Sequence, residues 1–229
     1  MRLRIVVIAV IVSAGSFACG STSKSGVEGS QDNSESSAIR AVYSIMLERS
    51  DLGSDGPGPR TILQALPGSQ LSQQMGRSFS DVVVTGTVSA VKEGQAYRVA
   101  DPPGATDSPV PWDSGDFDVL SLYVTFDVDQ DVCSSEPVPT SVTFRFFVSS
   151  KDKIETVRDG LEKMGEIAVF LKSSADPQDP VFYQADSDGL LSEVDADGHI
   201  PWPVAEGHYG ETWTRGGETV ASLRQSCPA

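Results

Sequence analysis

The residues of this chain that are best placed to do chemistry are closely spaced aspartates. One group alternates along a predicted strand and two Asp-x-Asp-Gly units follow later: Asp127, Asp129 and Asp131, then Asp186 and Asp188, then Asp195 and Asp197. Calcium binds several carboxylate oxygens on a sharply turning loop, so each group is a candidate calcium site. Val132 and Val138 stand where a helix-loop-helix calcium site requires glycine and glutamate. Hairpin turns also use Asp-Gly pairs, so turns with solvated carboxylates remain the alternative.

Other catalytic chemistry has less support in the sequence. His199 and His208 are the only histidines, and with Glu206 they would make a two-histidine, one-carboxylate metal site or, alternatively, ordinary loop residues. No Gly-x-Ser-x-Gly segment joins a predicted strand to a predicted helix, so no serine nucleophile is indicated. Glycoside hydrolysis would require two acids facing each other across a cleft. We therefore expect no catalysis and no organic cofactor, and keep a glycan-processing hydrolase as an alternative.

The N-terminus has the pattern of an export signal. A short basic start is followed by an apolar run over 5–14, small residues around Phe17, and Cys19. The apolar run is shorter than the roughly 20 residues of a membrane-spanning helix, and its order is typical of a cleaved signal peptide. Cleavage after Ala18 would leave Cys19 first, where a bacterial lipoprotein carries its diacylglyceryl and palmitoyl-type chains. Dual acylation gives stable anchoring, so Cys19 is the predicted lipidation site.

The other two cysteines are an even pair in an oxidising compartment. With Cys19 lipidated, Cys133 and Cys227 remain, and thiols outside the cytoplasm tend to pair. The sequence therefore predicts a disulfide between a mid-chain loop and the C-terminus, with two buried thiols as the alternative. Neither cysteine has a neighbouring histidine in the sequence, so no thiol nucleophile is proposed.

The charge of the chain is strongly negative and unevenly distributed. The formal net charge is −15, and loss of Arg2 and Arg4 with the signal would make it −17. Residues 99–144 and residues 173–214 each hold nine acids and no lysine or arginine. Such a surface repels nucleic acid and anionic lipid and attracts cations or basic partners, although solubility alone is a sufficient explanation.

Hydrophobic patterning predicts one β-rich domain behind a tether. We expect a signal peptide over 1–18, a lipidated cysteine and flexible Ser/Gly-rich tether over 19–37, and a single globular domain over 38–229. Alternating residues predict long strands over 81–91, 119–129 and 141–149, and a period-3.6 pattern predicts helices over 38–49 and 154–164. Shorter strands are expected over 167–171, 181–184 and 190–195, and a small helix over 218–224.

The order of these elements indicates a mainly β fold with short helices. Several strands, one inserted helix and then more strands are typical of a small OB-like β-barrel, with an open β-sandwich as the alternative. Gly86 inside a strand predicts a bulge or a sharp bend. Glu93-Gly94 and Asp188-Gly189 predict hairpin turns. Proline- and glycine-rich loops hold three tryptophans that would either contact a glycan or protein partner or pack the end of the barrel: Trp112, Trp202 and Trp213.

Five segments of the chain resemble a loose group of uncharacterised bacterial exported lipoproteins. They are Asp81-Val-Val-Val-Thr-Gly-Thr-Val88, Tyr123-Val-Thr-Phe-Asp-Val128, the turn at Gly165, Val169-Phe-Leu171 and Gly189-Leu-Leu-Ser-Glu-Val-Asp-Ala-Asp-Gly198. The resemblance covers about residues 81–200 and implies an OB-like barrel at the extracytoplasmic face of the cell membrane. It implies no chemistry. We therefore expect an interaction or ligand-binding module whose partners are the membrane, through its lipid, and an envelope protein or glycan; a calcium-dependent envelope protein is the first alternative.

Overall fold

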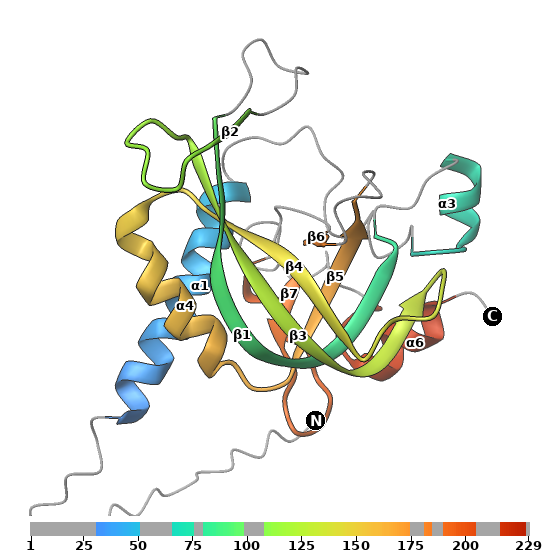
Figure 1. Ribbon diagram of the computed structural model, residues 1–229. Coiled ribbons are helices and arrows are strands. Elements are labelled where there is room, and N and C mark those ends of the chain that lie inside the picture. The colour runs from blue at the N-terminus through green and yellow to red at the C-terminus, as the bar shows by residue number, and fades with distance from the viewer. Residues whose placement is uncertain are drawn as a thin grey trace, which may run out of the picture.

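The computed structural model describes residues 31–50, 66–75, 80–98, 108–174, 181–184, 190–204 and 216–227. Several predictions concern residues outside these ranges: the signal peptide, Cys19, the pair Asp186 and Asp188, Glu206, His208 and Trp213. The described residues form strands and a few mostly short helices (Figure 1). The predicted fold class, mainly β with short helices, is confirmed.

The elements follow the predicted order. The helices are α1 (Gln31–Ser50), α3 (Gln70–Met75), α4 (Ile154–Lys163, preceded by the 3-10 turn Lys151–Lys153) and α6 (Val220–Ser226). The strands are β1 (Val82–Arg98), β2 (Ser108–Val110), β3 (Val119–Ser134), β4 (Ser141–Val148), β5 (Ile167–Ser173), β6 (Phe182–Gln184) and β7 (Leu191–Glu193). Helix α1 begins at Gln31, inside the segment that was expected to be part of the tether.

All described strands belong to one coiled sheet, so the alternative of two stacked sheets does not apply. Strand β1 pairs antiparallel with both β3 and β5, and β3 pairs antiparallel with β4. The small strand β6 lies between β5 and β4, antiparallel to the first and parallel to the second. This is the pairing order of an OB-type barrel, with α4 inserted between β4 and β5. The sheet remains open, because β6 pairs with β4 only at Phe144 and Arg145.

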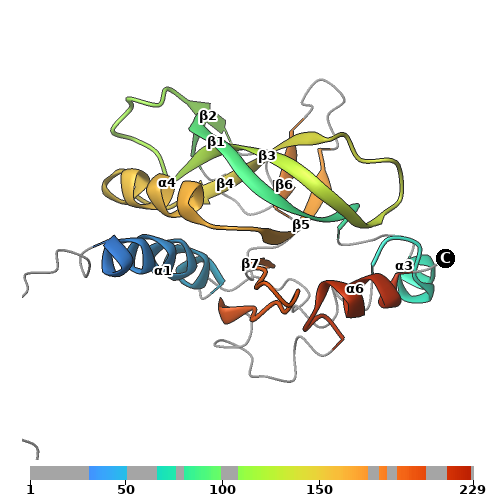
Figure 2. The same cartoon turned by 90° about the horizontal axis from the view of Figure 1, so that it is seen from below.

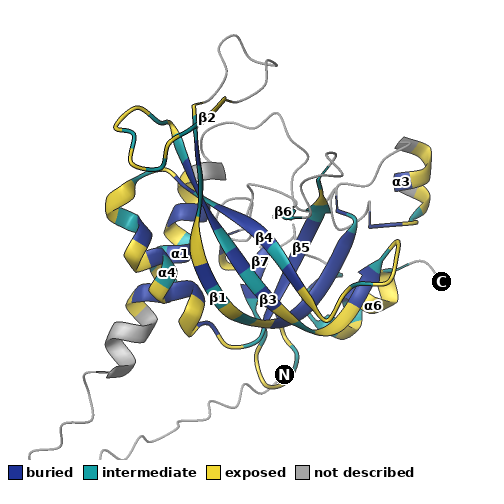
Figure 3. Cartoon of the chain, viewed as in Figure 1, coloured by how far each residue is buried: buried dark blue, intermediate teal, exposed yellow. Residues whose placement is uncertain are grey.

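Alternation along the long strands produces the interior of this sheet. The inward residues of β3 are fully buried, as are most of those of β4 (Figure 3): Leu120, Leu122, Val124, Phe126, Phe144, Phe146 and Val148. The predicted irregularity at Gly86 is present as a register shift between Thr85 and Gly86. A Cβ at Gly86 would collide with the carbonyl oxygen of Asp127, so glycine allows β1 and β3 to approach closely there. A second shift after Val88 turns Val91 inward in place of Ala90.

Two predicted hairpins are wrong. Strand β1 continues through Glu93 and Gly94, where it only shifts register against β3. A Cβ at Gly94 would lie 2.6 Å from the carbonyl oxygen of Ser121, so this glycine permits close strand packing rather than a turn. Strands β6 and β7 both pair with β5 and not with each other, so these two described strands do not form the expected hairpin; Asp188-Gly189 itself lies outside the described residues.

Helices α1 and α4 pack side by side against one end of the sheet (Figure 2). Val42, Ile45 and Met46 of α1 join the interior core together with Val157 and Leu161 of α4. The crossing is close at Gly160, where a Cβ would lie 2.6 Å from Cγ2 of Val42 and would also collide with the Ala38 carbonyl. Glycine at position 160 is therefore required for this contact.

Tyr43 ties α1 to the sheet. Its hydroxyl oxygen accepts a hydrogen bond of 3.2 Å from the backbone N–H of Glu193 in β7. Burial raises the pKa of Tyr43 above its ordinary value, and the neighbouring Glu193 carboxylate acts in the same direction. The helix that follows the predicted tether is thus an integral part of the domain.

A second core lies on the outer side of β1 and β5, and the sequence did not predict it. Trp202 is fully buried there, with its ring centroid 5.6 Å from that of Phe170, and its Nε1 donates a 2.7 Å hydrogen bond to the carbonyl of Gly217. The expectation that Trp202 packs the barrel end is wrong. The other members come from distant segments: Leu66, Val83, Val132, Cys133, Ala168, Leu190, Ile200 and Leu223.

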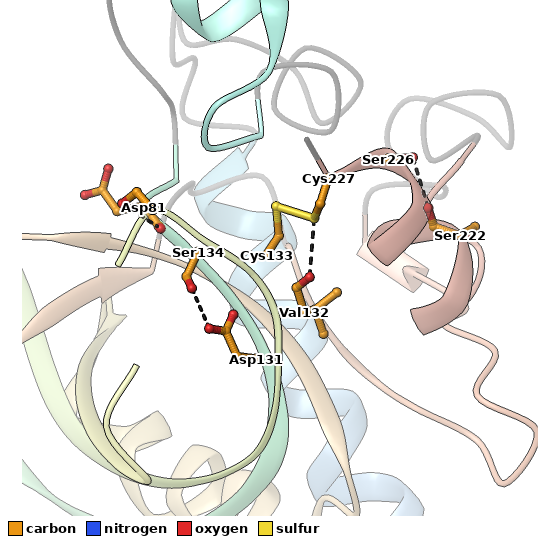
Figure 4. Close-up of a disulfide and its surroundings, with 9 residues drawn as sticks. Asp81, Asp131, Val132, Cys133, Ser134, Ser222, Ser226 and Cys227 are labelled. Atoms are coloured by element: carbon orange, nitrogen blue, oxygen red, sulfur yellow. Dashed lines mark hydrogen bonds between the residues drawn. A yellow bond between two sulfur atoms is a disulfide. The ribbon is translucent and has the colours of Figure 1, made fainter. Parts of the chain in front are cut away.

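The C-terminal helix closes this second core. Helix α6 starts at a capping box formed by Thr219 and Ser222, and its Leu223 is 1% exposed. Immediately after it, Cys227 is joined by a disulfide to Cys133, with Cα atoms 5.8 Å apart and a sequence separation of 94 residues (Figure 4). The pairing is the one that the cysteine count indicated.

Candidate functional site

A groove lined by described residues lies at the open end of the sheet. Its volume is about 660 Å³, and it lies where the end of β5, the start of β1, the small strand β6 and the β3–β4 loop meet. We call it the mouth groove. Its lining residues are Asp81, Val82, Ser135, Glu136, Pro137, Val138, Pro139, Lys172, Ser173, Ser174 and Phe182.

The mouth groove combines apolar and polar walls. Val82 belongs to the interior core, and Val138 and Phe182 pack against that core from the groove side. Pro137 and Pro139 flank Val138, and each proline ring fixes its own φ and restricts the residue before it. The β3–β4 loop is therefore a stiff wall whose shape does not depend on a ligand.

Asp81 fixes the geometry of the groove. Lys172 Nζ donates a 2.6 Å hydrogen bond to its Oδ1, and both the backbone N–H (2.9 Å) and the hydroxyl of Ser173 donate to its Oδ2. Its own backbone N–H donates to the carbonyl of Leu171 at 2.8 Å, and its carbonyl accepts from the N–H of Ser135 at 3.2 Å. One residue thus joins β1, β5 and the β3–β4 loop.

These contacts also control the ionisation of Asp81. Burial works against the charged form, but the hydrogen bonds from Lys172 and Ser173 outweigh it and hold the pKa of Asp81 below its ordinary value. The Asp81 side chain is 20% exposed and that of Lys172 is 40% exposed, so water partly screens the pair.

The second acid of the groove has a different environment. Glu136 is exposed, and within the part of the chain that the structure describes it makes no hydrogen bond or ion pair. The three charged residues of the groove are Asp81, Glu136 and Lys172. Because Asp81 and Lys172 neutralise each other, the uncompensated charge of the groove is the carboxylate of Glu136.

This arrangement favours binding over acid–base catalysis. Two carboxylates do share the groove, as a glycoside hydrolase would require. However, Lys172 donates to Oδ1 of Asp81 and Ser173 donates twice to its Oδ2, which leaves one of about four lone-pair sites, and its lowered pKa makes it a poor proton donor. The mouth groove therefore holds one carboxylate that is engaged in hydrogen bonds, Asp81, and one without a partner among the described residues, Glu136.

The predicted calcium ligands that the structure describes do not line this groove. Asp127, Asp129 and Asp131 are exposed along β3, where Asp127 Oδ1 accepts from Ser89 Oγ at 3.1 Å and Asp131 Oδ2 accepts from Ser134 Oγ at 2.5 Å. Across the residues described, no three His, Cys, Asp or Glu side chains are grouped to hold a metal ion. A calcium site stays a prediction, and its second group, Asp186 and Asp188, lies outside the described residues.

The Asp195-Ala-Asp-Gly unit forms the turn that was the alternative. Asp195 Oδ1 accepts from the backbone N–H groups of Asp197 (3.0 Å) and His199 (2.8 Å), and Gly198 adopts φ of +77°. The Asp195 carboxylate therefore organises its own backbone, as aspartate commonly does in turns. His199 is exposed, with Nδ1 3.9 Å from Asp195 Oδ2.

A stacked arginine stands on the outer face of the sheet. Arg145 of β4 is 7% exposed, and its Cζ lies 5.8 Å from the ring centroid of Tyr97 and 5.6 Å from that of Tyr123. Tyr97 also makes an edge contact with Phe147, with centroids 6.4 Å apart. These side chains cross β1, β3 and β4, so the stack holds the three strands together on that face.

Sequence reasoning missed the mouth groove. Asp81, Glu136, Lys172 and Phe182 come from four segments, and no pair of them has a spacing that suggests a site. The one local signal is the Pro-Val-Pro sequence after Glu136, which indicates a stiff loop without indicating what it faces. Only the pairing of β1 with β5 and the insertion of β6 bring these residues together.

Comparisons with known proteins find no match for this chain: no protein-family model, no curated protein and no solved structure is similar to it. Among the helices that the structure describes, none is long and apolar enough to cross a membrane. The resemblance to exported lipoproteins and the lipid anchor on Cys19 stay predictions.

Proposed function

We propose that the protein is a lipid-anchored, extracytoplasmic binding module of the cell envelope that holds a small ligand in the mouth groove and does not transform it. The observation that carries this proposal is the groove itself: a hollow of about 660 Å³ with an apolar floor and a polar rim. Ligand pockets of proteins typically measure about 300–1,000 Å³ and favour the mouths of β-barrels.

The groove is stiff before any ligand arrives. Asp81 holds three chain segments together through hydrogen bonds of its side chain and backbone, and Pro137 and Pro139 restrict the β3–β4 loop. A preformed site avoids much of the entropic cost of ordering loops on binding. A stiff, preformed groove supports the binding of a small ligand more than it supports folding around an extended partner chain.

The location follows from the N-terminal sequence. A basic start, a short apolar run and Cys19 support export and lipidation, and pairing of Cys133 with Cys227 fits an oxidising compartment. Helix α1 starts at Gln31, so few residues separate Cys19 from the folded domain. The module is therefore held close to the membrane surface.

A screen with matched variants tests the proposal. Full-length protein in detergent is incubated with small amines, sugars, short peptides and organic acids, and ligands are detected by a rise in melting temperature. Ser135→Trp fills the groove from an exposed position and keeps the backbone hydrogen bond to Asp81, while Ser149→Trp places the same bulk on an exposed position away from it.

Two results are possible for the proposed site. Ligands that stabilise the wild type and Ser149→Trp but not Ser135→Trp would support binding in the mouth groove. If every stabilising ligand acts equally on Ser135→Trp, or if none stabilises the wild type, the groove is not the functional site and the proposal is wrong.

A further inference from the structure

We infer that the mouth groove takes a small amine-bearing ligand whose cationic nitrogen pairs with Glu136 while its apolar or ring-shaped body lies against Val82, Val138 and Phe182. The inference rests on the proposed function and specifies the chemistry of the ligand. It depends on three observations about the groove: its charge balance, its apolar floor and the stiffness of the loop that carries Glu136.

The charges of the groove residues determine whether the ligand should be a cation or an anion. Lys172 Nζ lies 2.6 Å from Asp81 Oδ1, so the one cation of the groove is already paired. An anionic ligand that used Lys172 would compete with Asp81 and would also lie near the Glu136 carboxylate. An amine meets the opposite situation, because Glu136 has no partner among the described residues.

The acidic segment that contains the β3–β4 loop also favours a positively charged ligand. The β3–β4 loop belongs to residues 99–144, which hold nine acids and no lysine or arginine, and the chain as a whole carries a net charge of −15. A negative field of this extent raises the local concentration of small cations and lowers that of anions. Free inorganic anions are therefore poor candidates for the groove.

The apolar lining of the groove indicates that the ligand also has an apolar or ring-shaped body. Phe182 is half-buried, packs against the interior core and lines the groove together with Val82 and Val138. An aromatic ring and a carboxylate that line the same groove suit an amine with an apolar or ring-shaped body, since the ring attracts both a cation and C–H groups. A bare metal ion would leave this floor unused.

The backbone on both sides of Glu136 is restrained. Pro137 follows Glu136 directly and restricts it to an extended conformation. Ser135, on the other side, is tied to Asp81 by a backbone hydrogen bond of 3.2 Å. The residue that would recognise the amine is thus held on both sides before the ligand binds.

Two charge series of probes test the inference. Glucosamine, N-acetylglucosamine and glucuronate share a sugar ring, and benzylamine, benzamide and benzoate share an aromatic ring, so each series runs from cation to neutral molecule to anion. Affinities are measured by titration calorimetry on full-length protein in detergent, with Ser135→Trp as the reference for binding outside the groove and for partition into detergent.

Glu136→Gln removes the proposed partner, and Glu162→Gln is its matched control. Glu162 is an exposed acid on α4 that does not line the groove, so both variants change the net charge by the same amount. We expect the amine of at least one series to bind about three- to tenfold tighter than its neutral analogue, as for a partly exposed ion pair. Glu136→Gln should remove that preference and Glu162→Gln should retain it.

The outcomes separate this inference from the proposed function. A preference for amines that is lost only in Glu136→Gln supports the inference, and the series that shows it distinguishes an amino sugar from an aromatic amine. Equal binding of neutral or anionic probes, or equal losses in both glutamine variants, overturns the inference while binding in the groove stands. Failure of all six probes overturns the inference, and the wider screen with Ser135→Trp then decides the proposed function.

Discussion

The link between Cys133 and Cys227 gives the clearest quantitative prediction. The perturbation is the double substitution Cys133→Ser and Cys227→Ser, which removes the disulfide and leaves two small polar side chains. Helix α6 keeps its other contacts in this variant, namely the Thr219 capping box, buried Leu223 and a 2.9 Å hydrogen bond from Arg224 to Gln130. We therefore expect the native fold to persist at low temperature.

The magnitude follows from the length of the closed loop. The two cysteines are 94 residues apart in the sequence, and in the chain-entropy model closing such a loop stabilises the folded state by about 4.7 kcal/mol. The effect arises because the bridge restricts the unfolded chain, so the loss of stability should be accompanied by a larger dependence of stability on urea concentration. A loss that came only from native contacts would leave that dependence unchanged.

The assay is equilibrium urea unfolding of the wild type with and without reductant, and of the double variant with and without reductant. We expect reduced wild type to resemble the double variant, and reductant to leave the double variant unchanged. A difference below about 1 kcal/mol between oxidised and reduced wild type would refute the loop-closure reasoning. Detection of two free thiols by mass spectrometry in protein taken directly from cells would refute the disulfide itself.

Three further predictions concern the groove, the helix pair and the anchor. Asp81→Asn should lower the free energy of unfolding by about 1–2 kcal/mol near neutral pH. Because the folded pKa of Asp81 is lowered, this difference should be present above the ordinary aspartate pKa and disappear as the pH falls through the folded value, measured by urea unfolding at several pH values. Gly160→Ala should cost about 1–3 kcal/mol and speed amide exchange in α1, since its Cβ would collide with Ala38 and Val42; Gly165→Ala, with nothing within 4 Å, is the control. Cys19→Ser should release the protein from the membrane fraction, seen by fractionation and immunoblotting; retention would contradict lipidation.

Much of the fold was predictable because the burial of apolar side chains determines which face of each long strand points inward. Leu120, Leu122, Val124 and Phe126 must all leave water on one side, and a period of two residues is enough to place them. The helix over 154–163 was equally clear, because its apolar residues repeat every three to four positions. The pattern within each of these segments shows which of its faces is buried, without knowledge of the elements that pack against it.

The predictions that failed depend on partners far away in the sequence. Gly94 was expected in a turn, and only the backbone of β3 decides that it marks a close approach between strands, as Gly86 does. Val83 and Phe170 are on the outer side of their strands, and their burial requires Trp202 and Leu223 from the C-terminal segment. Patterns in a single strand show that a face is apolar, but not that a second core will cover the other face.

For the same reason, the many acids in the sequence led the prediction away from the candidate site. Asp127, Asp129 and Asp195 drew attention because they cluster in the sequence, yet the structure places each of them on an exposed strand or in a turn. Asp81 lies outside both acid-rich segments, but among the acids that the structure describes it makes the most hydrogen bonds, because β1, β5 and the β3–β4 loop converge on it. A carboxylate gains a specific role from what surrounds it, since water and salt screen the exposed ones. Glu136 is the opposite case. The other charged residues of the groove, Asp81 and Lys172, neutralise each other, and the carboxylate of Glu136 has no partner among the described residues.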